Sequence, residues 1–149
     1  MFFMKEIRLK VRNKVKGKIM KFISTKEAPA AIGPYSQAVE VNGFIYTSGQ
    51  IALMPDGTME TTDVEHQTHQ VMKNLYYVLE AAGAHFNDVI KTTIYLADMN
   101  DFDTVNKVYA HYFGLHKPVR STVAVRTLPK NALVEIDCIA ISNTDMNFG

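Results

Sequence analysis

The chain has 149 residues, of which 47% are hydrophobic and 21% charged, the size and balance of one soluble globular domain. No run approaches the roughly 18 apolar residues of a membrane span. The single cysteine, Cys138, excludes an intrachain disulfide, and the lack of a Cys/His cluster excludes the common structural zinc sites. This cysteine content fits a reducing compartment, and we expect a cytoplasmic protein.

Charge is unevenly distributed along the chain. Residues 1–20 contain seven Lys or Arg and one Glu, a charge of +6, while the whole chain carries +1, so the other 129 residues carry −5. An apolar residue recurs at every fourth position of this basic segment: Phe3, Ile7, Val11, Val15 and Ile19. Such a pattern is typical of a targeting helix, for mitochondria or another organelle, or of a helix on a membrane surface.

Other features of the same segment favour different interpretations. Gly17 weakens a helix, and Ile7, Leu9 and Val11 alternate with polar residues as in a strand. A flexible tail, a start codon assigned too early with Met20 as the initiator, and a nucleic-acid-binding arm remain alternatives. We therefore expect residues 1–19 to be a leader outside the fold, residues 20–142 to form one domain, and residues 143–149 to form a tail.

The first part of the domain is predicted to be mainly β-structure. Residues 21–25 predict a short strand, and an irregular loop with Pro29, Gly33 and Pro34 follows. Residues 38–41 and 44–48 are rich in β-favouring side chains and flank Asn42-Gly43, a strong hairpin signal. A Pro-Asp-Gly sequence within residues 54–58 predicts another turn.

The stretch from Asp63 to Gly83 predicts a long helix, with Asp63 as its N-cap and Gly83 as its stop. One helical face carries the positions Val64, Thr68, Val71, Met72, Leu75, Val78, Leu79 and Ala82. Residues 88–98 predict a strand, residues 100–113 a second helix, and residues 118–126 and 132–141 two final strands. The order β-β-β-α-β-α-β-β favours an α+β fold, with one sheet and two helices on one face.

Common catalytic motifs are absent from the sequence. The cluster Asp63, Glu65, His66 and His69 lacks a third metal ligand at the right spacing and is typical of a helix start, so we expect no metal site there. Residues 48–50 lack the G-x-S-x-G frame of a serine hydrolase, and no dinucleotide or Walker motif occurs. The aromatic strand motif of an RNA-recognition domain is also missing.

Two charged residues interrupt the apolar pattern of the last two strands. Arg120 lies within residues 118–126, and Glu135 lies within residues 132–141. Solvent-facing strand positions account for such charges in a generic sheet, as they do for Arg126 and Asp137. However, a guanidinium on a rigid strand can bind a carboxylate through two hydrogen bonds, and a nearby glutamate can transfer protons.

Several longer motifs resemble one known family. They are GPYSQAV (33–39), TSGQI (47–51), EAAGA (80–84), DVIKTTIYLADMNDFDTVN (88–106), PVRSTVAVRTLP (118–129) and VEIDCIAI (134–141). From about residue 20 to residue 142 the chain is similar to the reactive imine/enamine deaminase A family, also called YjgF-type. The resemblance implies a chorismate-mutase-like α+β fold, assembled as a homotrimer with clefts between subunits.

The resemblance also implies an activity and a set of residues. Members hydrolyse reactive enamines and imines (2-aminoacrylate, 2-iminobutanoate, 2-iminopropanoate) to 2-keto acids and ammonia, without a cofactor. Carried over, Arg120 holds the substrate carboxylate and Glu135 lies near the attacking water. Tyr35, Ser48 and Asn106 line the cleft, and Thr122 stands where many relatives have cysteine.

The family leaves other functions open. Some members are described as endoribonucleases or translation inhibitors, and others bind small carboxylates as regulators. The −5 charge of residues 21–149 disfavours a large phosphate-binding surface, so we do not expect nucleic acid as the main partner.

Overall fold

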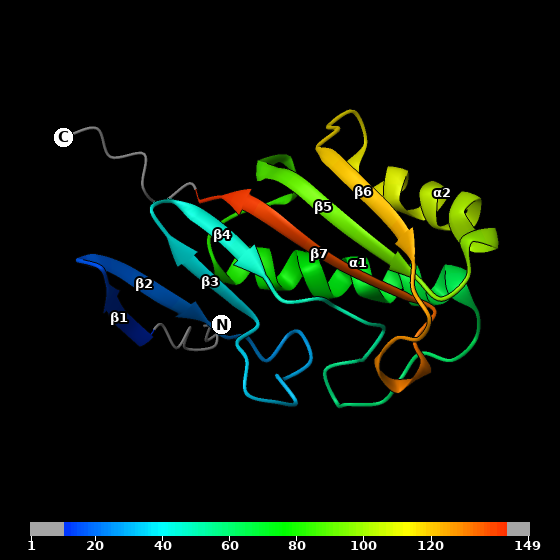
Figure 1. Cartoon of the computed structure of the whole chain (residues 1–149), viewed down its shortest axis with the longest axis horizontal. Coiled ribbons are helices and arrows are strands. Elements are labelled where there is room, and N and C mark those ends of the chain that lie inside the picture. The colour runs from blue at the N-terminus through cyan, green and yellow to red at the C-terminus, as the bar shows by residue number, and fades with distance from the viewer. Residues whose placement is uncertain (1–10, 143–149) are drawn as a thin grey trace, which may run out of the picture.

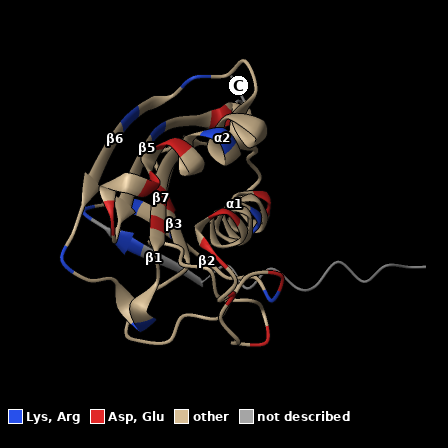
Figure 2. Ribbon diagram, turned by 90° about the vertical axis from the view of Figure 1, so that its right-hand side faces the viewer, with Lys and Arg blue, Asp and Glu red and all other residues tan. Residues whose placement is uncertain are grey.

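One mixed, seven-stranded β-sheet forms the body of the protein, and both long helices pack on the same face of it (Figures 1 and 2). The computed structural model describes residues 11–142. The strands are Val11–Val15 (β1), Lys18–Ile23 (β2), Ala38–Val41 (β3), Phe44–Thr47 (β4), Val89–Leu96 (β5), Val119–Ala124 (β6) and Val134–Ile141 (β7). Their order in the sheet is β1-β2-β3-β4-β7-β5-β6, and β5–β6 is the parallel pair. The expected α+β class is confirmed.

The helices are Val64–Ala81 (α1) and Phe102–Phe113 (α2). Three short 3₁₀ turns, Phe86–Asp88 (η1), Met99–Asp101 (η2) and Pro129–Asn131 (η3), lead into β5, α2 and β7. The second helix thus begins two residues later than expected, because its first turn is 3₁₀. Within residues 11–142 no helix has the length and apolarity needed to cross a membrane.

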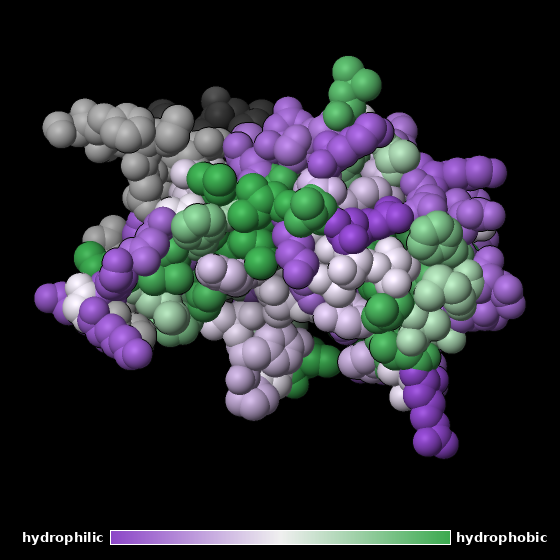
Figure 3. All heavy atoms as spheres, turned by 45° about the horizontal axis from the view of Figure 1, so that its top comes forward, coloured by the Kyte–Doolittle hydropathy of each residue, from purple (hydrophilic) through white to green (hydrophobic). Residues whose placement is uncertain are grey.

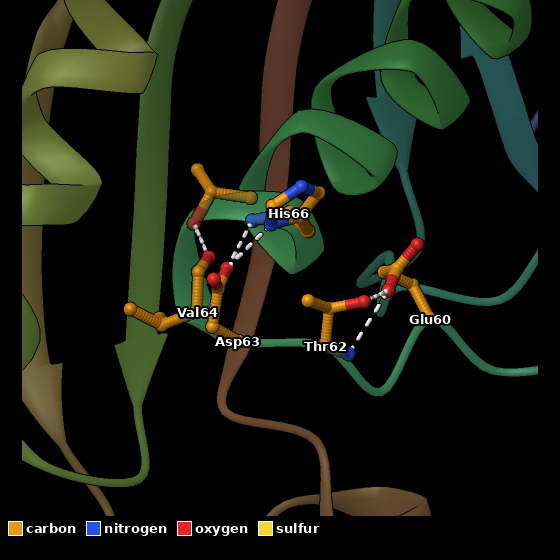
Figure 4. Close-up of polar contacts among 6 residues, drawn as sticks. Glu60, Thr62, Asp63, Val64 and His66 are labelled. Atoms are coloured by element: carbon orange, nitrogen blue, oxygen red, sulfur yellow. Dashed lines mark hydrogen bonds and ion pairs between the residues drawn. The ribbon is translucent and has the colours of Figure 1, made fainter.

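Helix α1 begins and ends where its sequence predicts. The Asp63 carboxylate accepts a hydrogen bond from the backbone N–H of His66 at 2.8 Å and contacts its ring nitrogen Nδ1 at 2.8 Å (Figure 4). At the other end Gly83 has a φ of +84°, a left-handed conformation that glycine adopts without steric cost. The acidic and imidazole groups at this helix start therefore have a capping role.

The hydrophobic core lies between the helices and the sheet. Most predicted inward positions of α1, including Val71, Leu75 and Leu79, are buried and join one cluster with the inward side chains of β7, whereas Val64 at its start is only partly buried. β7 alternates strictly, with Val134, Ile136, Cys138 and Ala140 facing the helices. This burial fixes the register of β7, because a one-residue slip would move its apolar side chains to the opposite face.

Two tight turns organise the N-terminal half of the sheet. Asn42 and Gly43 have φ values of 53° and 77°, and they connect β3 to β4 as predicted. Lys16 and Gly17 have φ values of 49° and 76°, and they connect β1 to β2 in the same way. Gly17 therefore reverses the chain rather than weakening a helix.

The N-terminal boundary of the fold differs from the expectation. Residues 1–19 were expected to lie outside the fold, whereas β1 and the start of β2 belong to the sheet. Strand alternation and the Lys16-Gly17 turn outweigh the four-residue periodicity in this stretch. The expected tail, residues 143–149, and residues 1–10 lie outside the described residues, and the roles considered for the leader stay predictions.

The face of the sheet opposite the helices is left open. Figure 3 views this face obliquely and shows hydrophobic side chains gathered near its middle. The strand pairings place the following exposed residues on it: Phe44, Tyr46, Val119, Val123 and Ile141. Exposed apolar surfaces of this kind are common at protein–protein contacts.

Candidate active site

Arg120 lies on edge strand β6 and faces the helix layer. Its guanidinium carbon is 4.9 Å from the centre of the Tyr109 ring and 5.6 Å from that of Phe102, both on α2. Tyr109 is itself held by a 2.8 Å hydrogen bond between its hydroxyl and Oγ1 of Thr92 on β5. The two rings hold the planar guanidinium by cation–π contact. No carboxylate in the described part of the chain forms an ion pair with Arg120, so its N–H groups are available to a ligand.

A cavity of about 300 Å³ opens beside Arg120, between α2 and the start of β6. Asn106, Tyr109, Lys117 and Arg120 contribute its polar wall, together with His116. None of the residues that line it is acidic. The Arg120 and Lys117 cations and the Asn106 amide therefore favour a small anion, such as a carboxylate, in this cavity.

Glu135 lies on the other face of the sheet, in a smaller pocket of about 60 Å³. Tyr35, Ser48 and Gly49 share this pocket with it. Burial, and to a lesser extent the neighbouring charge of Asp137, raises the pKa of the Glu135 carboxyl. Burial likewise raises the pKa of Asp137, which its bond to Tyr95 and the charge of Lys91 partly oppose. A carboxyl group whose pKa is raised in this way is suited to proton transfer.

A buried glutamine holds the Glu135 pocket together. Gln37 is 4% exposed, and its side chain bonds the backbone of Thr25 in both directions and the carbonyl oxygen of Pro29. The backbone carbonyl oxygen of Gln37 accepts hydrogen bonds from the backbone N–H and the hydroxyl group of Ser48. Gln50 then donates its side-chain N–H to the Ser48 hydroxyl at 3.2 Å. Gln37 thereby ties the loop that bears Tyr35 to the strand end that bears Ser48.

The predicted site residues fall into two groups within one chain. Tyr35, Ser48 and Glu135 share the smaller pocket, and Asn106 and Arg120 share the larger cavity. These groups lie on opposite faces of the sheet, because Arg120 is on the helix side and Glu135 is on the open side. One chain therefore does not form a single site from all of them.

Thr122 lies two residues beyond Arg120 on the same face of β6 and lines neither pocket. Its hydroxyl oxygen is buried and has no hydrogen-bond partner among the described residues. Its expected contact with substrate stays a prediction.

Sequence reasoning missed three residues of these pockets. Gln37 and Gly49 lie inside the quoted motifs GPYSQAV and TSGQI, but their residue types carry no chemical signal. Tyr109 was expected only as an inward-facing helix residue. Its contact with Arg120 depends on how α2 crosses β6, which a sequence pattern does not specify.

Cys138 lies on the helix side of β7 and is buried, and this burial raises its pKa to about 12. At pH 8 only about one thiol in 10⁴ is then ionised, and the thiolate is the reactive form. We therefore expect iodoacetamide to label the native protein very slowly at pH 8 without changing its activity, and to label it rapidly in urea. Mass spectrometry of timed samples measures both rates, and fast native labelling would contradict this assignment.

The described residues contain no group of three or more His, Cys, Asp or Glu side chains that could hold a metal ion. His66 is bonded to Asp63, and His69 is bonded through Nδ1 to the Tyr112 hydroxyl at 2.8 Å. The histidines of α1 thus have structural partners.

Comparison with known proteins identifies the family. Residues 25–142 match the family described as Endoribonuclease L-PSP. The chain belongs to this family. It is 48% identical over 124 residues to the human 2-iminobutanoate/2-iminopropanoate deaminase, covering 83% of this chain and 90% of that protein. The expected resemblance to the reactive intermediate deaminases is thereby confirmed.

Other members of the family extend the comparison. The chain is 51% identical over 119 residues to the Reactive Intermediate Deaminase A, chloroplastic, of Arabidopsis thaliana; this covers 79% of the chain and 64% of that longer protein. The crystal structure of E. coli TdcF with bound serine superimposes with a TM-score of 0.78 at 42% identity, covering 81% of this chain and 98% of that one. An organelle form thus exists among the relatives, and the cytoplasmic location expected here stays a prediction.

Proposed function

We propose that this protein hydrolyses small 2-imino acids and their enamine tautomers to 2-keto acids and ammonia, without a cofactor. The observation that carries the proposal is the ring-stacked guanidinium of Arg120, which forms no ion pair with a described residue and lies beside a cavity that no acidic residue lines. It suits the carboxylate that every such substrate carries. The names of relatives about half identical to this chain, in particular the human deaminase, support the same reaction.

The reaction requires little beyond positioning and proton transfer. Protonation at carbon converts an enamine to an iminium ion, whose C2 is already electrophilic. Water adds to C2 and loses a proton to the Glu135 carboxylate, giving a carbinolamine. Glu135 returns this proton to the nitrogen. The C–N bond then breaks as the hydroxyl oxygen forms the carbonyl and gives its proton back to the Glu135 carboxylate, and ammonia and the keto acid are released. Tyr35 and Ser48 offer hydroxyl groups to the water and the leaving nitrogen from the same pocket.

We further propose that the complete site lies between two subunits of a homotrimer. Arg120 and Glu135 lie on opposite faces of one sheet, so a cleft that holds both takes one from each of two copies. Arg120 is on edge strand β6, from which it can reach a neighbouring subunit. The exposed apolar side chains of the open face supply a surface for association, and a head-to-tail contact that repeats around a threefold axis closes into a ring.

The test of the proposed function is a direct assay with freshly generated 2-aminoacrylate or 2-iminobutanoate. We expect ammonia and keto acid to be released in equal amounts, well above the spontaneous rate, and the rate to survive dialysis against EDTA. Binding of 2-ketobutyrate without turnover would instead favour a regulatory protein. The family's description favours a second candidate, ribonuclease activity, so the same preparation is incubated with labelled RNA. RNA cleavage without imine turnover would overturn the proposal.

A further inference from the structure

Gly49 lies directly against the Glu135 side chain, and backbone hydrogen bonds hold the residues before and after it. The preceding residue, Ser48, donates its backbone N–H to the Gln37 carbonyl at 2.9 Å. The following residue, Gln50, exchanges two backbone hydrogen bonds with Ile136, of 2.9 and 3.1 Å. Because Ile136 is the neighbour of Glu135, these bonds set the distance between the Gly49 backbone and the glutamate.

A side chain at position 49 has no room while Glu135 stays in place. A Cβ atom built on Gly49 would lie 2.8 Å from Cδ, 2.8 Å from Oε2 and 3.1 Å from Cγ of Glu135. The φ of Gly49 lies outside the left-handed region, so the backbone itself accepts an L-residue. The clash falls on the end of a flexible side chain, so the carboxyl group moves and the backbone does not.

We propose that Gly49 is a positioning residue: by lacking a side chain, it sets where the Glu135 carboxyl group stands in the pocket. The inference rests on the proposed function, in which this carboxylate takes a proton from water. No hydrogen bond to another described residue holds the carboxylate, so the space that Gly49 leaves open decides whether it can stay where it stands. A general base must lie about 2.6–3.2 Å from the atom it deprotonates, and an error of about 1 Å can cost on the order of 100-fold in rate.

The first test is Gly49→Ala, measured in the imine assay beside the wild type. We expect kcat to fall about 10- to 100-fold with little change in KM, because the alanine displaces the carboxyl group that transfers the proton and leaves Arg120, which binds the substrate carboxylate, unchanged. We expect the thermal midpoint to stay the same or to rise, because alanine reduces the conformational freedom of the unfolded chain. The acidic limb of the plot of kcat against pH should also move, because the displaced carboxyl group is buried to a different extent and its pKa changes with that burial.

The second test places the same change in a Glu135→Asp background. Aspartate lacks Cδ and Oε2, the two glutamate atoms that the alanine Cβ would meet at 2.8 Å, and its shorter side chain can turn its carboxyl group away from position 49. We therefore expect Gly49→Ala to have little or no effect on the rate of Glu135→Asp, so that the two substitutions are strongly non-additive. Equal losses in both backgrounds would overturn the inference, since they would locate the effect in the backbone.

The outcomes separate this inference from the proposed function. Full activity of Glu135→Gln would show that the glutamate takes no part in the reaction, and it would therefore also overturn the inference about Gly49. An inactive Glu135→Gln together with a fully active Gly49→Ala would overturn the inference and leave the proposed function standing.

Discussion

Replacing Arg120 with alanine is expected to lower kcat/KM for 2-imino acids by about 10²–10³-fold. The substitution removes the charged fork that holds the substrate carboxylate, and losing one partner of such a pair costs about 3–4 kcal/mol. We expect KM to rise and kcat to fall together, because the carboxylate also orients C2 toward the water. Stability should change little, since Arg120 lies at an exposed position and contributes mainly its contacts with two rings.

Two matched variants control the Arg120 experiment. Arg120→Lys keeps the charge but loses the planar fork and its stacking on Tyr109, so it should recover only part of the activity. Arg126→Ala removes an exposed arginine just beyond β6 and should leave kcat/KM unchanged. The same assay with circular dichroism and size-exclusion chromatography shows that each variant is folded. A folded Arg120→Ala protein with near-wild-type kcat/KM would show that Arg120 does not bind the substrate carboxylate.

Replacing Glu135 with glutamine is expected to lower kcat by about 10²–10⁴-fold, the usual contribution of a general acid–base residue. Binding of the product 2-ketobutyrate should change much less, because it requires Arg120 to hold its carboxylate but requires no proton transfer. The folded state raises the pKa of Glu135 and therefore favours its protonated form, so the stability gained from this group is lost as pH rises through that pKa. Glutamine is always neutral, and at pH 7 this variant should be at least as stable as the wild type.

The pH profile distinguishes Glu135 from its neighbour Asp137. The wild-type acidic limb should lie above the ordinary glutamate pKa of about 4.3, because burial raises the pKa of Glu135. Asp137→Asn removes the smaller, electrostatic cause of that shift, so the limb should move to lower pH and persist. Glu135→Gln should remove it. If the limb disappears in Asp137→Asn instead, Asp137 carries the proton.

Mixing the two inactive variants tests whether the site is shared between subunits. Arg120→Ala subunits keep Glu135, and Glu135→Gln subunits keep Arg120. When the two are unfolded together and refolded at equal amounts, about a quarter of the clefts in random trimers receive both functional residues. We expect activity to return to about that fraction of the wild type. No recovery in refolded mixed trimers would argue for a site within one chain.

Local patterns predicted most of the elements, and the reasons are visible in particular residues. The α1 helix has an N-cap at Asp63, an apolar face and a left-handed Gly83, and each is a property of nearby residues alone. The Asn42-Gly43 hairpin is equally local. The N-terminal hairpin was missed because a four-residue periodicity and a two-residue alternation overlap in the same stretch. Pairing of β2 with β3 in the sheet favours the strand, and a sequence window does not contain that pairing.

The sequence by itself determined the family, the α+β class and the identity of the two charged residues that break the strand pattern, since these depend on motifs and periodicities along the chain. It did not determine that Arg120 and Glu135 face opposite sides of the sheet. That depends on β5 pairing in parallel with β6 and antiparallel with β7, which places Thr92 beside Arg120 and Tyr95 beside Glu135. The contacts with Tyr109 and Gly49 were likewise decided only by the tertiary structure. Packing of α2 on β6 places Tyr109 beneath the guanidinium, and the Gln50–Ile136 bridge brings Gly49 against the glutamate.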